Sequence, residues 1–188
     1  MKISVVIPHY EVDESYRAVL DACISSMKGQ YDELIVIPDK IHNLSRKINK
    51  GILQSTGDYI VVCNNDILLD KGTLKDMCQE GVVVTPYVNG RSEKLFHAHM
   101  WVFSRKVLSE VGLMSEEYDG FYYDDSDYWM QIESRGFKIH QMENVNIIHT
   151  HPARTLSRLE QSSTQNNNKA LFIKKWGMEN YLKIIKLT

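Results

Sequence analysis

Short, solid runs of apolar residues punctuate the first half of the chain. Residues 3–7 (ISVVI), 33–37 (ELIVI), 59–63 (YIVVC) and 82–85 (VVVT) are such runs, and most of their side chains are β-branched. A run of this length and composition is typical of a strand that is buried on both faces of a sheet. The pattern therefore predicts four core strands in the first half.

Between these runs the apolar residues recur at helical spacing. We expect helices over residues 13–27 and 43–55, the second with apolar side chains at every fourth position and with Asn43 as its N-cap. Strands and helices that alternate in this way favour right-handed crossovers between parallel strands. The sequence thus predicts an α/β fold, in which a Rossmann-like, mostly parallel sheet is flanked by helices.

The second half of the chain has a different pattern and predicts a smaller region beside that sheet. We expect strands over residues 99–103 and 145–151, and helices over residues 104–112, 122–136 and 166–176. The second of these helices opens with several acidic residues. Because no repeat and no linker composition interrupts the chain, we expect a single domain.

The overall composition agrees with a soluble globular domain. The chain has 188 residues, of which 43% are hydrophobic and 24% charged, with a net charge of −2. Such a small net charge gives no global field that would attract nucleic acid or an anionic membrane. The last 36 residues are locally basic, however, with seven Lys or Arg against two Asp or Glu.

The cysteines indicate a reducing compartment. Cys23, Cys63 and Cys78 lie in apolar surroundings without the close spacing of a zinc site or a disulfide framework. No run approaches the ~20 apolar residues that a membrane-spanning helix needs. We therefore expect a cytoplasmic protein whose basic tail could rest on the anionic inner surface of a membrane.

Polar residues follow each of the first three strands directly. They are Pro8-His9-Tyr10, Pro38-Asp39 and Asn64-Asn65-Asp66. In open α/β sheets ligands bind beyond the carboxyl ends of the strands, so these residues should line one crevice. A polar turn is the simpler alternative for Asn64-Asn65-Asp66, because these residue types favour turns.

Six segments, in order along the chain, resemble the family 2 glycosyltransferases of the GT-A fold. They are SVVIPHY (4–10), ELIVIPD (33–39), NKGILQSTGDYIVVCNND (49–66), VGLMSEEYDGFYYDDSDYWMQIESRGFKI (111–139), IIHTH (147–151) and NNNKALFIKKWG (166–177). The resemblance implies nucleotide-sugar binding by residues 1–85, acceptor binding and catalysis by residues 86–152, and a helical tail over residues 153–188. It implies inverting transfer of a sugar from a nucleoside diphosphate, with UDP expected, to an acceptor hydroxyl of a glycan or a lipid-linked saccharide.

The resemblance also implies a metal site for Mn²⁺ or Mg²⁺. A divalent cation stabilises the charge that develops on a departing diphosphate, and these ions prefer oxygen ligands, with imidazole accepted by Mn²⁺. Asp66 and His149 are the expected ligands, and His151 is an alternative to His149 on the same face of its strand. Asn64 stands where the family has a first aspartate, so the motif carries one charge instead of two.

The acidic segment DDSD is the expected catalytic motif. The attacking hydroxyl must lose a proton, and the resemblance assigns this to Asp125 as general base, with Asp124 orienting it. Asp127 and Trp101 are expected on the acceptor side. Aspartates in the first turn of a helix also cap it, which needs no catalysis, and crowded carboxylates raise one another's pKa.

The remaining expectations concern the nucleotide and two histidines. The resemblance places Pro8, Tyr10 and Asp39 where the family holds the base and the ribose, and Asn64 and Asn65 are expected to bind the nucleotide sugar as well. Asn43 and Lys47 begin the second helix and could approach the nucleotide or the diphosphate, although a lysine there fits a solvated helix face equally well. His97 and His99 are spaced as in some zinc sites, but an acceptor contact or a plain strand fits them better because no further ligand lies nearby in the sequence.

Two other functions stay open. One is sugar transfer to hydroxymethylated bases in DNA, for which the basic tail would meet phosphates. The other is a nucleotide-sugar or glycan binding module that has lost catalysis, which the reduced charge at Asn64 keeps in play.

Overall fold

The computed structural model describes residues 1–9, 14–38, 43–92, 99–120, 122–150 and 158–186. The described strands are β1 (Ile3–His9), β2 (Glu33–Pro38), β3 (Tyr59–Cys63), β4 (Ile67–Lys71), β5 (Val83–Val88), β6 (Met100–Ser104) and β7 (Ile139–His149). The described helices are α1 (Glu14–Ser26), α2 (Leu44–Gln54), α3 (Arg105–Val111), α4 (Asp124–Ser134) and α5 (Arg158–Ile185).

The strands form one seven-stranded sheet in the order β2-β1-β3-β6-β5-β7-β4. β1 pairs with β2 and β3 in parallel, as the alternating pattern predicted. β5 and β7 are also parallel, whereas β6 and β4 run antiparallel to their neighbours. The predicted α/β class is therefore confirmed, with a mixed sheet whose N-terminal half is parallel.

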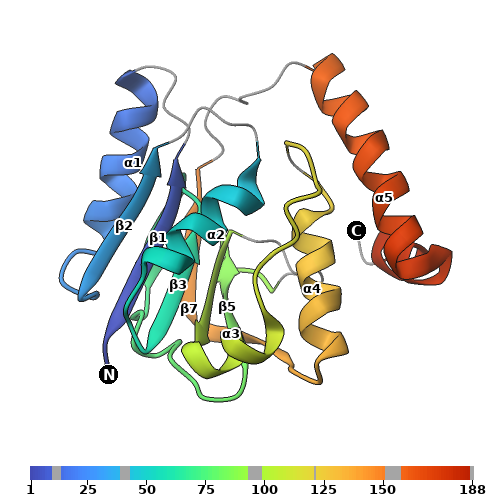
Figure 1. Ribbon diagram of the computed structural model, residues 1–188. Helices are drawn as coiled ribbons and strands as arrows, with labels where there is room; N and C mark the ends of the chain where they lie inside the picture. The colour runs from blue at the N-terminus through green and yellow to red at the C-terminus, as the bar shows by residue number, and fades with distance from the viewer. Residues whose placement is uncertain (10–13, 39–42, 93–98, 121, 151–157, 187–188) are drawn as a thin grey trace.

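Two apolar clusters lie on the two faces of the sheet, because neighbouring residues of a strand point to opposite faces. On one face Val5, Val61 and Cys63 pack with α1; on the other Val6 and Val62 pack with α2, α3, α4 and α5. In Figure 1, α1 and α5 stand at opposite sides of the molecule. The sheet is thus covered on both faces, which explains its solid apolar runs.

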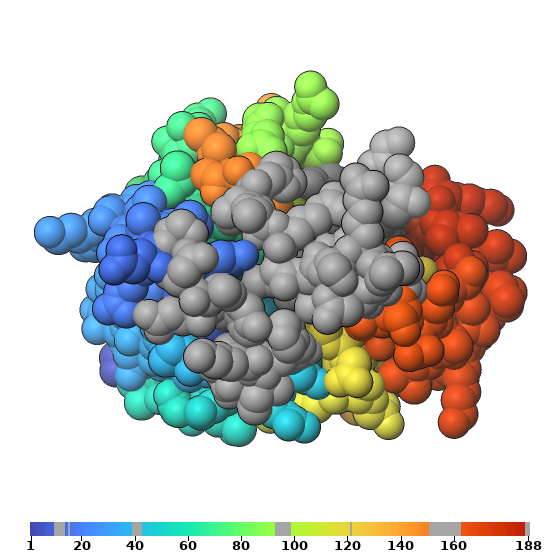
Figure 2. Space-filling model, turned by 90° about the horizontal axis from the view of Figure 1, so that it is seen from above, coloured from blue at the N-terminus to red at the C-terminus, as the bar shows by residue number. Residues whose placement is uncertain are grey.

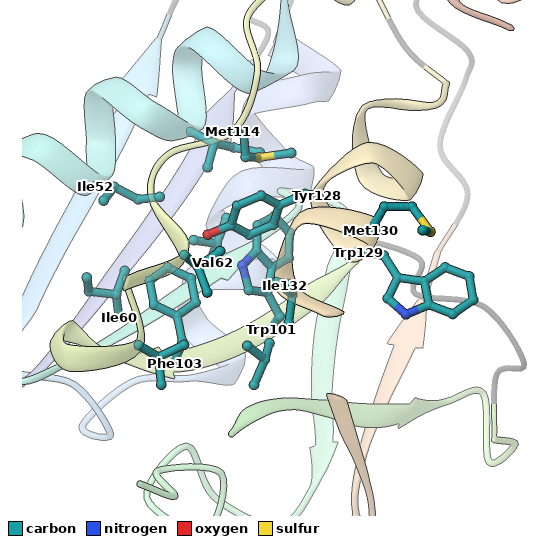
Figure 3. Packing of buried hydrophobic residues seen from close by; sticks show 14 of the residues in the cluster. Ile52, Ile60, Val62, Trp101, Phe103, Met114, Tyr128, Trp129, Met130 and Ile132 are labelled. Carbon is teal, nitrogen blue, oxygen red and sulfur yellow. The ribbon is translucent and has the colours of Figure 1, made fainter. Parts of the chain in front are cut away.

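Aromatic side chains fill the centre of the second cluster. Trp101 of β6 and Tyr128 of α4 lie side by side there, with ring centroids 6.4 Å apart (Figure 3). Phe103 lies next to them, and the side chains of Trp101 and Phe103 are at most 1% exposed. This packing attaches α4 and its acidic first turn to the sheet.

Three elements differ clearly from the sequence expectations. β7 (Ile139–His149) starts six residues before the strand predicted over residues 145–151. β4 was not predicted, because ILLDK is short and its last two side chains are exposed. α5 is far longer than the predicted helix over residues 166–176, and it kinks at Gly177, whose φ is +85°. Gly177 tolerates this left-handed conformation since it has no Cβ.

No helix in the described part of the chain is long and apolar enough to cross a membrane. The three cysteines are free; Cys23 and Cys63 are buried and Cys78 is partly so.

Candidate active site

The polar turn after β3 is held by groups from two neighbouring strands. The backbone N–H of Asn64 donates to the carbonyl of His99, just before β6, over 2.8 Å. The side-chain Nδ2 of Asn65 lies 2.9 Å from Nδ1 of His9, which ends β1 and is 1% exposed. The turn is therefore fixed at the edge where β1 and β3 end, as the sequence predicted.

Asp66 and His149 meet at this edge. Nε2 of His149 lies 3.0 Å from Oδ2 of Asp66, and the two side chains are 11% and 19% exposed. β4 brings them together, because Ile67 pairs with His149 across the antiparallel β4–β7 ladder. The N–H and hydroxyl of Thr150 both donate to the Asp66 carbonyl, which fixes that backbone further. The unpredicted strand thus places the two predicted ligands in contact.

The chemistry of this pair fits a divalent cation. Oδ1 of Asp66 is buried and accepts no hydrogen bond, which is costly for a carboxylate oxygen unless a cation or water meets it. One carboxylate and one imidazole suit Mn²⁺ well. Within the described ranges no group of three His, Cys, Asp or Glu is placed to hold a metal ion. The alternative ligand His151 lies outside the described residues.

His99 lies next to the Asp66–His149 pair, which the sequence did not predict. Its ring lies against that of His149, with centroids 4.1 Å apart and planes tilted by 35°. The H-x-H spacing drew attention to His99 but gave no sign of the contact, since residue 149 comes from a distant strand.

The acidic motif forms the first turn of α4. Asp124 is 6% exposed, and burial, followed by the charge of Asp125, raises its pKa to about 7. Asp125 is more accessible, and its Oδ1 accepts a 2.7 Å hydrogen bond from the N–H of Ser126. The two carboxylates therefore have different environments, although both lie in the first turn.

Two left-handed residues precede this motif. Tyr122 and Tyr123 have φ values of +77° and +68°, a conformation that is strained for bulky side chains. Backbone strain of this kind persists only where the surrounding structure imposes it. The start of α4 is therefore fixed by contacts from elsewhere in the chain.

Asp127 has a structural role, which corrects its predicted place at the acceptor. Its carboxylate is 1% exposed and accepts hydrogen bonds from the Tyr118 hydroxyl (2.9 Å) and from Nε1 of Trp176 (2.6 Å). Nζ of Lys175 lies 2.8 Å away and neutralises it. A carboxylate that is so enclosed has no surface for a sugar; it anchors α5 to α4.

Trp101 also needs correction. It was expected to contact the acceptor, but its side chain is fully buried against Tyr128. A side chain with no exposed area cannot stack on a bound sugar, so Trp101 belongs to the core.

Two of the residues that were predicted to bind the nucleotide, Pro8 and Asn43, lie in regular elements of the fold. Pro8 lies in β1 opposite Ile37. Asn43 caps α2 as predicted, accepting from the N–H of Arg46, but its Nδ2 donates to the carbonyls of Glu116 and Tyr118. Its amide thus holds the segment before α4, and a nucleotide contact would have to displace those bonds.

Three further nucleotide residues remain as expectations. Lys47 is 6% exposed within α2. Tyr10 and Asp39 lie outside the described residues.

Scans against protein-family models and curated protein sequences give no match. Among solved structures, the chain is similar to the catalytic domain of Drosophila β1,4-galactosyltransferase 7 in complex with xylobiose, with a TM-score of 0.60 and 12% identity over 87% of this chain and 79% of that one. A mutant of that enzyme with manganese, UDP-galactose and xylobiose gives a TM-score of 0.54 and 12% identity over 88% and 81% of the two chains.

A third similar structure comes from an archaeon. The mannosyltransferase PcManGT of Pyrobaculum calidifontis, in complex with GDP-mannose and Mn²⁺, gives a TM-score of 0.64 and 15% identity over 92% of this chain. This chain spans 64% of the length of the mannosyltransferase. These likenesses show that the chain has the GT-A fold that the sequence predicted.

Proposed function

We propose that the chain is a divalent-metal-dependent glycosyltransferase, which moves a sugar from a nucleoside diphosphate to an acceptor hydroxyl. The observation that carries this proposal is the contact of Asp66 with His149 beyond the sheet, with one carboxylate oxygen lacking a donor. The GT-A fold supports it, since the similar structures are of a galactosyltransferase and a mannosyltransferase. Their complexes with manganese favour Mn²⁺ as the ion here.

Asp66 and His149 would hold the ion, which supplies positive charge to the diphosphate as it leaves. Asn64 and Asn65 bring neutral amides to the same edge and fit hydroxyl groups of the donor. The fold itself does not select the base, because one similar structure holds UDP-galactose and another GDP-mannose. We retain UDP as the expected carrier from the family resemblance.

Asp125 would act as the general base. The acceptor oxygen attacks the anomeric carbon, the bond from that carbon to the phosphate oxygen breaks, and the hydroxyl proton passes to the Asp125 carboxylate. Direct attack from the opposite face inverts the anomeric centre. Asp125 suits this role better than Asp124, since its carboxylate is more exposed.

Asp124 would be the protonated neighbour of the base. Burial and the neighbouring charge raise the pKa of Asp124 to about 7, which lets it hold a proton near neutrality. A neutral Asp124 places no second negative charge beside Asp125.

The test is a thermal-shift panel of nucleotide sugars with and without Mn²⁺, followed by a turnover assay. A true donor with Mn²⁺ should raise the Tm by roughly 5–10 °C at a hundredfold excess over its Kd, because it binds only the folded state. Asp66→Ala and His149→Ala should each lose the manganese-dependent part of this shift. Asp70→Ala is the matched control, since Asp70 lies on β4 close to Asp66 in the sequence and accepts a hydrogen bond from Nδ2 of Asn146 on the surface.

Two outcomes decide between the candidate functions. A wild-type Tm that no nucleotide sugar moves in Mn²⁺ contradicts the proposal. A clear shift without release of nucleoside diphosphate, even slowly to water, favours a binding module instead.

A further inference from the structure

We propose that Asn168 of α5 is a positioning residue for Asp124 and Asp125. It acts by fixing the backbone that leads into α4. This inference rests on the proposed function, and it adds a residue from the C-terminal helix to the machinery of the site. Figure 2 shows α5, in red, at the side of the molecule opposite α1.

Asn168 connects two parts of the chain through its whole amide group. The side chain is 3% exposed, and its Nδ2 donates to the carbonyls of Asp119 (2.7 Å) and Tyr122 (3.0 Å). Its Oδ1 accepts from the N–H of Asp119 over 3.3 Å. Both N–H groups and the oxygen thus face the segment that precedes the acidic motif.

That segment needs such support. Tyr122 and Tyr123 are both left-handed, a conformation that is strained for bulky residues and persists only where neighbouring groups impose it. Asn168 holds the carbonyl of Tyr122. The ring of Tyr123 packs against Phe172 and Tyr181 at centroid distances of 5.7 and 6.3 Å. Helix α5 therefore holds both strained residues. Asn168 binds the backbone of Tyr122, and Phe172 and Tyr181 pack against the side chain of Tyr123.

The direction of the acidic side chains follows from this backbone. Asp124 is the first residue of α4 and comes directly after Tyr123, so the dihedral angles of the two tyrosines set where the first turn points. A relaxation at Tyr122 would rotate Asp124 and Asp125 relative to the edge of the sheet. Displacements of about 1 Å at a reacting group can lower a rate a hundredfold.

Other residues of α5 also attach this helix to the rest of the molecule, so the effect of Asn168 on the loop can be separated from an effect on stability. Lys175 and Trp176 bind Asp127 one turn further along α4, and Phe172 is buried in the core. These contacts remain when Asn168 is replaced. We therefore expect the loss of Asn168 to free residues 119–123 while α5 stays in place.

The experiment compares Asn168→Ala and Asn168→Asp with Asn167→Ala. Asn167 is the adjacent residue of the same type and is exposed, so its replacement controls for the loss of an asparagine from α5. Asn168→Asp keeps the size of the side chain. It replaces the NH2 group, which donates to two carbonyls, with an oxygen that can only accept. Hydrogen exchange of the peptide covering residues 119–125 is measured together with steady-state kinetics.

We expect both Asn168 variants to exchange faster over residues 119–125 and to lose about tenfold to a hundredfold in kcat. The donor KM and the Tm shift with donor and Mn²⁺ should stay as in wild type, because Asp66 and His149 do not lie on α4, α5 or residues 119–123. Asn167→Ala should match wild type in every measurement. If Asn168→Ala does not fold, Asn168→Ser, which keeps a short hydrogen-bonding side chain, replaces it.

Unchanged exchange in the Asn168 variants overturns the inference, since the loop is then held by other groups. Faster exchange with wild-type kcat also overturns it, because Asn168 would then have a structural role only. A wild-type protein that transfers no sugar overturns the proposed function, and catalytic positioning with it. In that case the exchange data still show whether Asn168 holds the loop, so the two failures are distinguishable.

Discussion

The raised pKa of Asp124 makes the stability of the fold depend on pH. Burial and the charge of Asp125 raise its pKa to about 7 from an ordinary value near 3.8. Between these two values the unfolded chain has lost the proton while the folded protein keeps it. The folded state therefore binds more protons, and the contribution of Asp124 to stability falls as the pH rises through this window.

Asp124→Asn should remove this dependence. An amide has nearly the shape of the protonated acid and never ionises, so at pH 8 we expect the variant to exceed the wild-type Tm by several degrees, on the order of 2–3 kcal/mol of unfolding free energy. At pH 4 the two proteins should be almost equally stable. Scanning calorimetry from pH 4 to pH 8 measures the difference, with Asp21→Asn on the exposed side of α1 as the charge control.

A Tm difference between Asp124→Asn and wild type that is the same at pH 4 and pH 8 would contradict this prediction. It would mean that the folded protein does not retain a proton at Asp124.

The residue scale also shows where sequence reasoning succeeds and where it stops. Asp66 and His149 could be predicted because each lies at the end of a strand, where position along the chain implies position in space. The hydrogen bonds of Asn168, and that of Asp127 with Trp176, could not be predicted, because these partners lie 46 to 49 residues away in the sequence. Trp101 was misassigned since its burial depends on the packing of α4.

At the scale of elements, periodicity identified the segments that bury a continuous apolar face. α2 lies within two residues of its predicted range, and its cap is correct. β4 was missed because half-exposed residues at the edge of a sheet give neither an apolar run nor a clear alternation. The first half of α5 was missed because the polar stretch QSSTQNNNK shows no apolar face at helical spacing.

The close packing of α2 against β1 gives a prediction at the scale of elements. A Cβ placed on Gly51 would collide with Cγ1 of Val6, and it would lie 3.4 Å from Cγ1 of Ile37. Val6 is fully buried in β1 and has little room to move. Gly51→Ala should therefore destabilise the protein by about 1–3 kcal/mol through overpacking, although alanine is the better helix former by about 1 kcal/mol.

Urea denaturation measures this difference. Lys50→Ala is the matched control, because Lys50 is the exposed neighbour on the same helix. A more stable Gly51→Ala would show that α2 can lift from the sheet at no cost, and the close packing of α2 on β1 would then be wrong.

At the scale of the molecule, the site joins regions that are far apart in the sequence. His9 and His149 end β1 and β7, and Asp66 lies in the turn between β3 and β4. In the proposed function α4 adds the carboxylates, and α5 binds the segment before them. The charged residues of α5 are partly engaged within the molecule. Lys175 pairs with Asp127 and Lys183 with Glu133. These pairs reduce the basic surface that the tail could offer to DNA or to a membrane.

The attachment of α5 gives the prediction that belongs to this scale. Asp127 is 1% exposed and its partner Lys175 is 33% exposed. Replacing one member of a buried pair leaves the other charge without compensation, which typically costs 3–5 kcal/mol. Because solvent reaches Lys175, we expect Asp127→Asn to lose on the order of 3 kcal/mol of unfolding free energy in urea, at the low end of that range.

The same variant should report on α5 directly. The indole N–H of Trp176 donates to Asp127 over 2.6 Å, so weakening that acceptor should change the tryptophan fluorescence and speed hydrogen exchange along α5. Lys174→Met removes an exposed lysine beside Lys175 and should change neither. An Asp127→Asn protein with wild-type stability and exchange would mean that apolar contacts alone hold α5. The polar cluster around Asp127 would then contribute to the specificity of docking and not to its strength.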